Sequence, residues 1–249
     1  MARRKRHNRR RRKGSLSFLY QLLCLVVMGG AIAAALVIFF KADHIAVEGN
    51  SRYTDAEILE ASGLHQGDNL FFFNKYDVAS HISKNLPYVE AVQINRNLPD
   101  TLVITVTECT DIVAVQQDGA VWLLCSTGKV VDSIAKAEGY PLVTGVTLTQ
   151  PAVGQRAQAA EGQEQKLEQL LSLLSQLRTK GMLPDVQEIH MEQEDLITFR
   201  YLDRFDVEIL PDADFDYKLS FLQAVVAKLQ DEQRGTLKLT GDDVRFIAQ

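Results

Sequence analysis

The longest apolar run in the chain covers residues 16–40 and contains no charged side chain. At about 1.5 Å per residue, a helix of this length would reach roughly 37 Å, against about 30 Å for the hydrocarbon core of a bilayer. The run therefore predicts one membrane-spanning helix. A cleaved export signal is the alternative, but such signals have an apolar core of only about 7–15 residues. Small residues at four-residue spacing suggest a face for packing a second helix, although they are common in membrane helices: Gly29, Gly30, Ala33 and Ala34.

Residues 43–108 alternate between short strand-like and helix-like segments. A strand with period-2 alternation comes first. Thr54 and Glu57 then form a capping box that predicts the start of a short helix, and Asn74 is placed to cap a second one. Two further strands follow, joined by a turn at 97–100. The predicted order is strand, helix, helix, strand, strand.

Residues 109–249 predict more strands and two helices. The pair Asp118-Gly119 separates two apolar segments and is typical of a two-residue hairpin turn. Both helices carry an apolar stripe. We expect the second stripe to pack on the sheet rather than pair with a partner helix, and we expect its helix to end at Gly235. The first stripe contains Leu167, Leu170, Leu171, Leu174 and Leu177, and the second contains Phe215, Leu219, Leu222, Val226 and Leu229.

Sequence motifs in both segments resemble those of a known family. Residues 45–108 include V-E-G-N-S-R-Y-T, N-L-P-Y-V-E and R-N-L-P-D-T-L-V-I-T-V-T-E, which are similar to POTRA domains and to the first extracytoplasmic domain of the FtsQ/DivIB family of bacterial cell-division proteins. The ending G-T-L-K-L-T-G-D-D-V-R-F-I resembles that family's closing strands, whereas residues 116–193 resemble it in element order alone. The resemblance implies an α+β fold with a single N-terminal transmembrane helix, a POTRA domain (β-α-α-β-β) at 43–108 and a mixed β domain with two helices at 109–249.

The charge distribution is strongly asymmetric about the apolar run. Nine of the 27 Lys and Arg residues lie in residues 1–15, with no acidic residue among them. The positive-inside rule therefore predicts a basic cytoplasmic tail at 1–15 and an extracytoplasmic location for the rest. Residues 41–249 carry 18 basic and 32 acidic side chains, so this part is a poor candidate for binding polyanions. Nucleic-acid binding by the tail is the competing interpretation, and the position of the tail beside the span disfavours it.

Motifs for catalysis are lacking in the sequence. It contains no G-x-S-x-G, H-E-x-x-H or G-x-x-x-x-G-K motif, and its five histidines are scattered singly. No enzyme activity, cofactor, metal or small-molecule substrate is therefore predicted. Two acidic clusters lack the loop spacing of a calcium site, so we expect solvated surface and a helix cap instead: Asp203/Asp206 and Asp212/Asp214/Asp216.

Cys109 and Cys125 are the two cysteines that follow the apolar run. If Asp118-Gly119 forms a two-residue turn, Cys125 lies opposite Ile112 and Cys109 lies about 10 Å farther along the partner strand. This separation exceeds the reach of a disulfide, so two free thiols are expected.

Because the sequence contains no catalytic motif, we expect the protein to act by binding a partner through a sheet edge. An exposed edge strand offers backbone groups that a partner segment can pair with. The candidate edge consists of Leu237, Lys238, Leu239, Thr240, Val244, Arg245 and Phe246.

The family resemblance implies a role and a location for such an edge. It implies a non-enzymatic scaffold at the division septum that binds the bilayer and partners of the FtsB/DivIC and FtsL type, and that helps to control septal peptidoglycan synthesis. Two alternatives remain open. One is a POTRA-containing component of envelope protein transport or assembly. The other is a membrane-tethered hydrolase or sensor, which would need a pocket with convergent ionisable groups.

Overall fold

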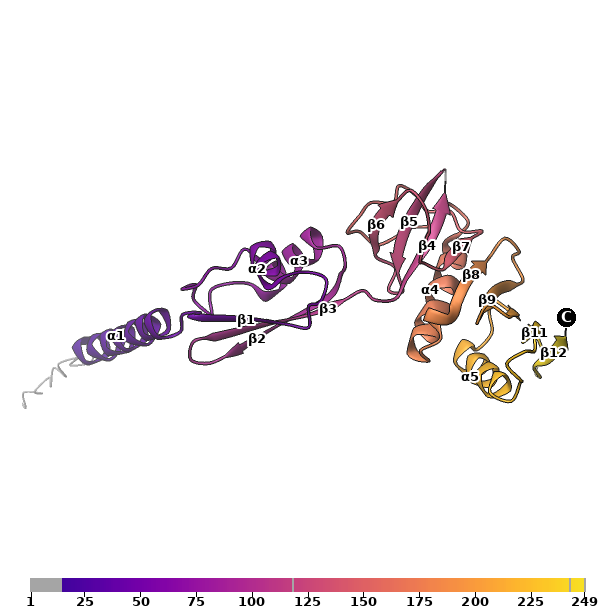
Figure 1. Cartoon of the computed structure of the whole chain (residues 1–249). Helices are drawn as coiled ribbons and strands as arrows, with labels where there is room; N and C mark the ends of the chain where they lie inside the picture. The colour runs from indigo at the N-terminus through magenta and orange to yellow at the C-terminus, as the bar shows by residue number, and fades with distance from the viewer. Residues whose placement is uncertain (1–14, 118, 242, 249) are drawn as a thin grey trace, which may run out of the picture.

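The computed structural model describes residues 15–117, 119–241 and 243–248. An apolar helix, α1 (Ser15–Phe39), projects from two folded domains that follow one another along the length of the molecule (Figure 1). Over Phe18–Phe39, no residue of this helix is buried by the described part of the chain. The helix predicted at 16–40 is thus present as an exposed apolar rod. The basic tail predicted at 1–15 lies outside the described residues, apart from Ser15.

The first domain is a three-stranded sheet with two helices packed on one face (Figure 1). Its elements are β1 (His44–Glu48), α2 (Asp55–Ser62), α3 (Lys75–Asn85), β2 (Val89–Asn97) and β3 (Thr101–Glu108). The central strand β3 runs parallel to β1 and antiparallel to β2, and it buries Leu102, Ile104 and Val106 in the core that α2 and α3 share. Thr54 and Glu57 form the predicted capping box of α2. The β-α-α-β-β order of a POTRA domain is therefore confirmed.

The second domain is organised on one nine-stranded mixed sheet with the order β12-β11-β10-β9-β8-β7-β4-β5-β6. Its elements are β4 (Ile112–Gln117), β5 (Ala120–Cys125), β6 (Val130–Ile134), β7 (Leu142–Thr144), α4 (Glu164–Thr179), the short 3-10 helix η1 (Leu183–Asp185), β8 (Val186–His190), β9 (Ile197–Tyr201), β10 (Phe205–Ile209), α5 (Phe215–Val226), β11 (Gly235–Lys238) and β12 (Arg245–Ala248). The apolar stripes of α4 and α5 are buried in one core with the sheet. The predicted α+β fold and the packing of the second stripe are confirmed.

The stripe predicted for α4 packs on the core, with Leu171 partly buried, and Leu173 is fully buried beside it because the buried face is wider than the predicted stripe. The end predicted for the second helix is wrong. Helix α5 ends at Val226 and not at Gly235. Gly235 instead begins β11, where a Cβ atom would lie 2.1 Å from the carbonyl oxygen of the neighbouring strand, so a glycine is required by strand contact.

Candidate partner-binding edge of the β domain

Strand β12 forms one edge of the nine-stranded sheet, at the end of the molecule opposite α1 (Figure 1). It pairs antiparallel with β11, with Leu237 opposite Phe246 and Lys238 opposite Arg245. On its other side, β12 has no strand neighbour among the described residues. The backbone groups on that side are therefore open to a partner strand.

The side chains of β12 divide between the core and the solvent. The ring of Phe246 packs edge-on against the ring of Phe205, with 6.2 Å between the ring centroids. Successive side chains of a strand point to opposite faces, so Arg245 and Ile247 lie on the face away from that core. Ile247 is 49% exposed and lies opposite Thr236 of β11. Phe246 thus fixes the strand, and Ile247 offers apolar surface to a partner.

The structure brings the seven predicted edge residues together, but it gives them different surroundings. Leu237 and Leu239 are fully buried, so their side chains belong to the core. Lys238 forms an ion pair with Glu208, with 2.9 Å between Nζ and Oε2. The side chains of Thr240 and Arg245 are exposed, and those of Val244 and Phe246 are partly buried against the core. Ile247 ends the predicted edge segment but is not among the seven named residues, although strand alternation puts it on the same face as Arg245.

The opposite edge of the sheet is partly covered. The backbone N–H of Val130 in β6 donates to the carbonyl oxygen of Gln155, and the Val130 carbonyl accepts from the N–H of Gly154, both at 2.8 Å. The loop between β7 and α4 therefore occupies the beginning of this edge. Of the two ends of the large sheet, β12 is the more open one.

A network of charged contacts joins the two domains. Arg178 of α4 pairs with Glu90 of β2 and with Asp111 of the connecting segment, each at 2.9 Å. Nζ of Lys129 donates to two backbone carbonyl groups of the first domain, each at 2.8 Å. Because these contacts come from both domains, the sheet edge is held at a defined distance from α1.

Cys109 and Cys125 lie at the same junction, next to Glu90. Their sulfur atoms and a carboxylate oxygen lie within 4.8 Å of one another. The predicted pairing of Cys125 with Ile112 is confirmed. The predicted 10 Å separation of the two cysteines is wrong because β4 begins at Ile112, so Cys109 does not continue along that strand. Both cysteines are free thiols in the described chain.

Two thiols and a carboxylate are donors that suit zinc. Here, however, Glu90 already pairs with Arg178, and the ammonium group of Lys129 lies close enough to interact with both sulfurs. The neighbouring Cys125 thiol and burial raise the pKa of Cys109. The same contact lowers the pKa of Cys125 to about 6, so Cys125 is the thiol of this pair that ionises first. The cluster thus lies at the domain junction, where one oxygen of Glu90 pairs with Arg178.

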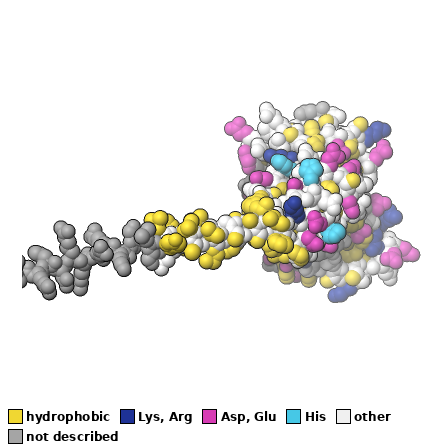
Figure 2. Space-filling view, turned by 90° about the vertical axis from the view of Figure 1, so that its left-hand side faces the viewer, with side chains coloured by type: hydrophobic (Ala, Val, Ile, Leu, Met, Phe, Trp, Pro, Cys, Tyr) yellow, Lys and Arg dark blue, Asp and Glu magenta, His cyan; other side chains and the backbone are white. Residues whose placement is uncertain are grey.

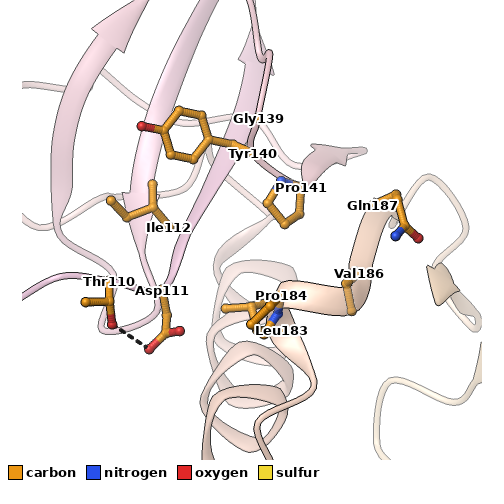
Figure 3. A pocket seen from close by; sticks show the side chains of 10 residues that line it. All are labelled: Thr110, Asp111, Ile112, Gly139, Tyr140, Pro141, Leu183, Pro184, Val186 and Gln187. Carbon is orange, nitrogen blue, oxygen red and sulfur yellow. Dashed lines mark hydrogen bonds between the residues drawn. The ribbon is translucent and has the colours of Figure 1, made fainter. Parts of the chain in front are cut away.

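A cleft of about 500 Å³ lies between the start of β4, the loop before β7 and the segment around η1 (Figure 3). The ionisable side chains in its lining are Asp111 and Tyr140. The carboxylate of Asp111 accepts a hydrogen bond from Thr110 at 3.3 Å and also pairs with Arg178. The cleft therefore does not assemble the several convergent groups that a hydrolase or sensor would require.

The small residues predicted as a helix-packing face lie on the exposed helix α1. A Cβ atom added at Gly29 or Gly30 would meet no described atom of the chain within 4 Å. A second helix could approach closely at this face. Such packing stays a prediction.

These features define a class of protein in which an apolar N-terminal helix is followed directly by a POTRA domain and then by a mixed β domain with an open sheet edge. Residues 40–108 match the family model described as POTRA domain, FtsQ-type. Residues 113–245 match the model described as Cell division protein FtsQ/DivIB, C-terminal. The chain belongs to the FtsQ/DivIB family of cell-division proteins, and the described residues include one helix long and apolar enough to span a membrane.

Relatives with these names cover much of the chain. Cell division protein FtsQ of Geobacter sp. (strain M21) is 29% identical over 198 residues, which are 78% of this chain and 70% of the relative. Cell division protein DivIB of Clostridium botulinum (strain Hall) is 26% identical over 131 residues, or 52% and 51% of the two chains. The solved extracytoplasmic domain of DivIB from Geobacillus stearothermophilus aligns at 20% identity and a TM-score of 0.31, over 49% of this chain and 95% of that one. Family membership favours a role in division over the envelope-transport alternative.

Proposed function

We propose that this protein is a non-enzymatic scaffold of the division machinery that captures a partner segment along β12. The partner would be a small single-pass division protein of the FtsB/DivIC type, held together with an FtsL-type protein, and the complex would help to control septal peptidoglycan synthesis. The observation that carries the proposal is the open edge of β12 in a chain of the FtsQ/DivIB family.

The chemistry of the edge defines the partner. A segment in extended conformation would pair with the open backbone groups of β12, each hydrogen bond contributing about 0.5–1.5 kcal/mol net. An apolar side chain of the partner would cover Ile247, and an acidic one would neutralise the exposed Arg245. Alternate side chains of a paired strand thus select the partner, while backbone pairing supplies general affinity.

The proposed orientation places the basic tail in the cytoplasm and both folded domains outside. It is supported by the nine tail cations on one side of the span and by the acidic composition of the other side. The β12 edge would then face the extracytoplasmic parts of single-pass partners.

Photo-crosslinking in dividing cells tests the proposed edge. A photoreactive amino acid at Ile247 is expected to capture a partner that mass spectrometry identifies as an FtsB/DivIC-type protein. The control probe replaces Tyr217, which is 55% exposed on α5 and is not part of the edge. Capture of this partner at Tyr217 but not at Ile247 would place the binding surface on the helical face.

A complementation experiment tests whether the edge matters for division. In cells depleted of the native protein, Ile247→Glu is expected to leave long, undivided cells at a normal protein level, because it places a charge where the partner's apolar side chain would be buried. Tyr217→Glu is the matched variant and is expected to restore septa. Normal division with Ile247→Glu would contradict the proposed site.

A further inference from the structure

The loop that precedes α3 is fastened to the end of the membrane helix. The side-chain amide of Asn69 donates to the carbonyl oxygen of Leu36, at 2.8 Å, in the last turn of α1. The backbone N–H of Leu70 donates to the carbonyl oxygen of Phe40 at 2.9 Å. The last carbonyls of a helix have no partner inside the helix, so this loop supplies what the helix end lacks. Its position is therefore set relative to α1.

The same loop exposes aromatic side chains beside the helix end. Phe71 is 42% exposed and Phe72 is 72% exposed. The ring of Phe71 stands edge-on to that of Phe40, with 5.3 Å between the ring centroids. Figure 2 shows the apolar surface of α1 continuing onto the adjoining part of the folded domain. The ring of Phe71 thus extends the apolar surface of the membrane helix, and the more exposed ring of Phe72 follows it in the same loop.

A third exposed apolar side chain, from another loop, lies at the same end of the domain. Leu98 is 55% exposed in the turn between β2 and β3. His44 at the start of β1 pairs with Thr101 at the start of β3, so this turn lies beside the chain that has just left α1. Exposed apolar groups from two separate loops therefore surround the helix end.

We propose that Phe71 and Phe72, with Leu98 beside them, insert into the headgroup layer of the adjacent leaflet and fix the POTRA domain on the bilayer surface. The 22 residues of Phe18–Phe39 span about 33 Å as a helix, which matches about 30 Å of hydrocarbon. Residues hydrogen-bonded to the end of this span must lie at the membrane–water boundary. Aromatic side chains are favoured at that depth.

Charged contacts hold the loop in this orientation. The guanidinium group of Arg96 lies over the rings of Phe71 and Phe73, 5.7 Å and 5.0 Å from their centroids. Arg96 also donates to the carbonyl oxygen of Phe73 at 3.4 Å. Arg96 of β2 thus holds the aromatic loop in place, and a loop held in this way can limit the tilt of the domain relative to the membrane.

Fluorescence quenching by lipid tests the insertion without any division partner. The full chain is reconstituted into phosphatidylcholine vesicles in which the acyl chains are brominated near the headgroup. The native protein has one tryptophan, Trp122, and its emission is subtracted as the reference. In Phe72→Trp, the added emission is expected to shift to the blue and to be largely lost in brominated vesicles. In the control Tyr217→Trp, on α5, the added emission is expected to stay unquenched.

A second probe guards against a local change caused by the first substitution. Phe71→Trp places the indole one residue earlier, beside Phe40, and is expected to be quenched as well. If both probes respond to brominated lipid no more than Tyr217→Trp, the loop faces water and the proposal is overturned. This result would leave the proposed binding at β12 untouched, because the vesicles contain lipid and this protein alone.

Discussion

At the scale of single residues, Gly145 shows how closely the strands of the β domain approach each other. Its φ is +84°, and an added Cβ would lie 2.3 Å from the backbone carbon of Met191. Residues that carry a side chain rarely adopt this backbone conformation, and here the backbone of Met191 would also have to move. Both the positive φ and the close backbone contact therefore require a glycine at this position.

Gly145→Ala is expected to lower the free energy of unfolding by roughly 3 kcal/mol. Gly139→Ala is the matched control, because Gly139 has a φ of +85° but no described atom within 4 Å of the added Cβ. It is expected to cost about 1–2 kcal/mol from backbone strain alone. Denaturant unfolding of the full chain in detergent, followed by Trp122 fluorescence, measures both. Equal losses would show that the close approach to Met191 does not matter.

Glu108 is a buried carboxylate at the end of β3 that organises the turn after β1. Ser51 donates to it through both its N–H and its hydroxyl group, and Arg52 and Tyr53 donate through their N–H groups. Burial raises the pKa of Glu108, but these hydrogen bonds outweigh it and lower the pKa below the ordinary 4.5. The stabilisation is therefore complete above that value and is lost as the pH falls through the lowered pKa.

Glu108→Gln is expected to lower the free energy of unfolding by about 1–3 kcal/mol at neutral pH, because an amide offers one neutral acceptor to four donors. The loss should shrink as the pH falls below 4.5, where the unfolded carboxyl group gains a proton, and should vanish below the lowered pKa of the folded one. Glu48→Gln, at an exposed position of β1, should have little effect at any pH. Unfolding followed by circular dichroism at several pH values tests this. A loss that does not change with pH would exclude the charge as its cause.

At the scale of helices and strands, local signals predicted most of the fold. The capping box of Thr54 and Glu57 and the antiparallel pairing of β4 with β5 depend on neighbours in sequence, and both were predicted correctly. The parallel pairings of β7 with β8 and of β10 with β11 depend on residues far apart, so only the structure gives the strand order.

The candidate site divides in the same way. Its place near the C-terminus was predicted from the alternation of apolar and polar residues and from the family resemblance. The burial of Leu237 and Leu239 depends instead on the core that the sheet shares with α4 and α5. The approach of Cys109 to Cys125 depends on where β4 begins, and the hairpin turn alone does not determine that position. The sequence thus indicated which segment forms the edge, whereas tertiary packing decides which side chains it presents.

The contact between α4 and β2 provides a test of how firmly the two domains are joined. Arg178→Met leaves the carboxylate of Glu90, whose side chain is only 15% exposed, without its ionic partner. We expect a loss of about 1–3 kcal/mol in unfolding free energy, because an unpaired carboxylate would remain largely out of water.

Hydrogen exchange would show where this loss acts. Arg178→Met is expected to speed amide exchange on both sides of the junction, around Val89 and Ser126. Lys136→Met is the control, because Lys136 and Glu138 form an ion pair with side chains that are 79% and 84% exposed. Such a pair contributes about 0–1 kcal/mol. Similar exchange in both variants would mean that the domains are not coupled through Arg178.

At the scale of the whole molecule, the elements form a line from α1 through the POTRA domain to β12 (Figure 1). The aromatic loop meets the membrane end of this line, the charged junction stiffens its middle, and the open edge lies at its far end. A partner bound at β12 would therefore be held at a set distance from the bilayer, provided that both domains lie on one side of it.

The proposed orientation can be tested with a single new cysteine in the β domain. Tyr217→Cys is expected to react with a membrane-impermeant maleimide in intact spheroplasts, because the position is 55% exposed on α5 and lies outside the edge where the partner is proposed to bind. The native chain is its own control, since Cys24 lies in the predicted span and Cys109 and Cys125 are buried, so it should not react. Equal labelling before and after lysis would fit an extracytoplasmic edge. Labelling only after lysis would place β12 in the cytoplasm, where it could not meet the extracytoplasmic segments of single-pass partners.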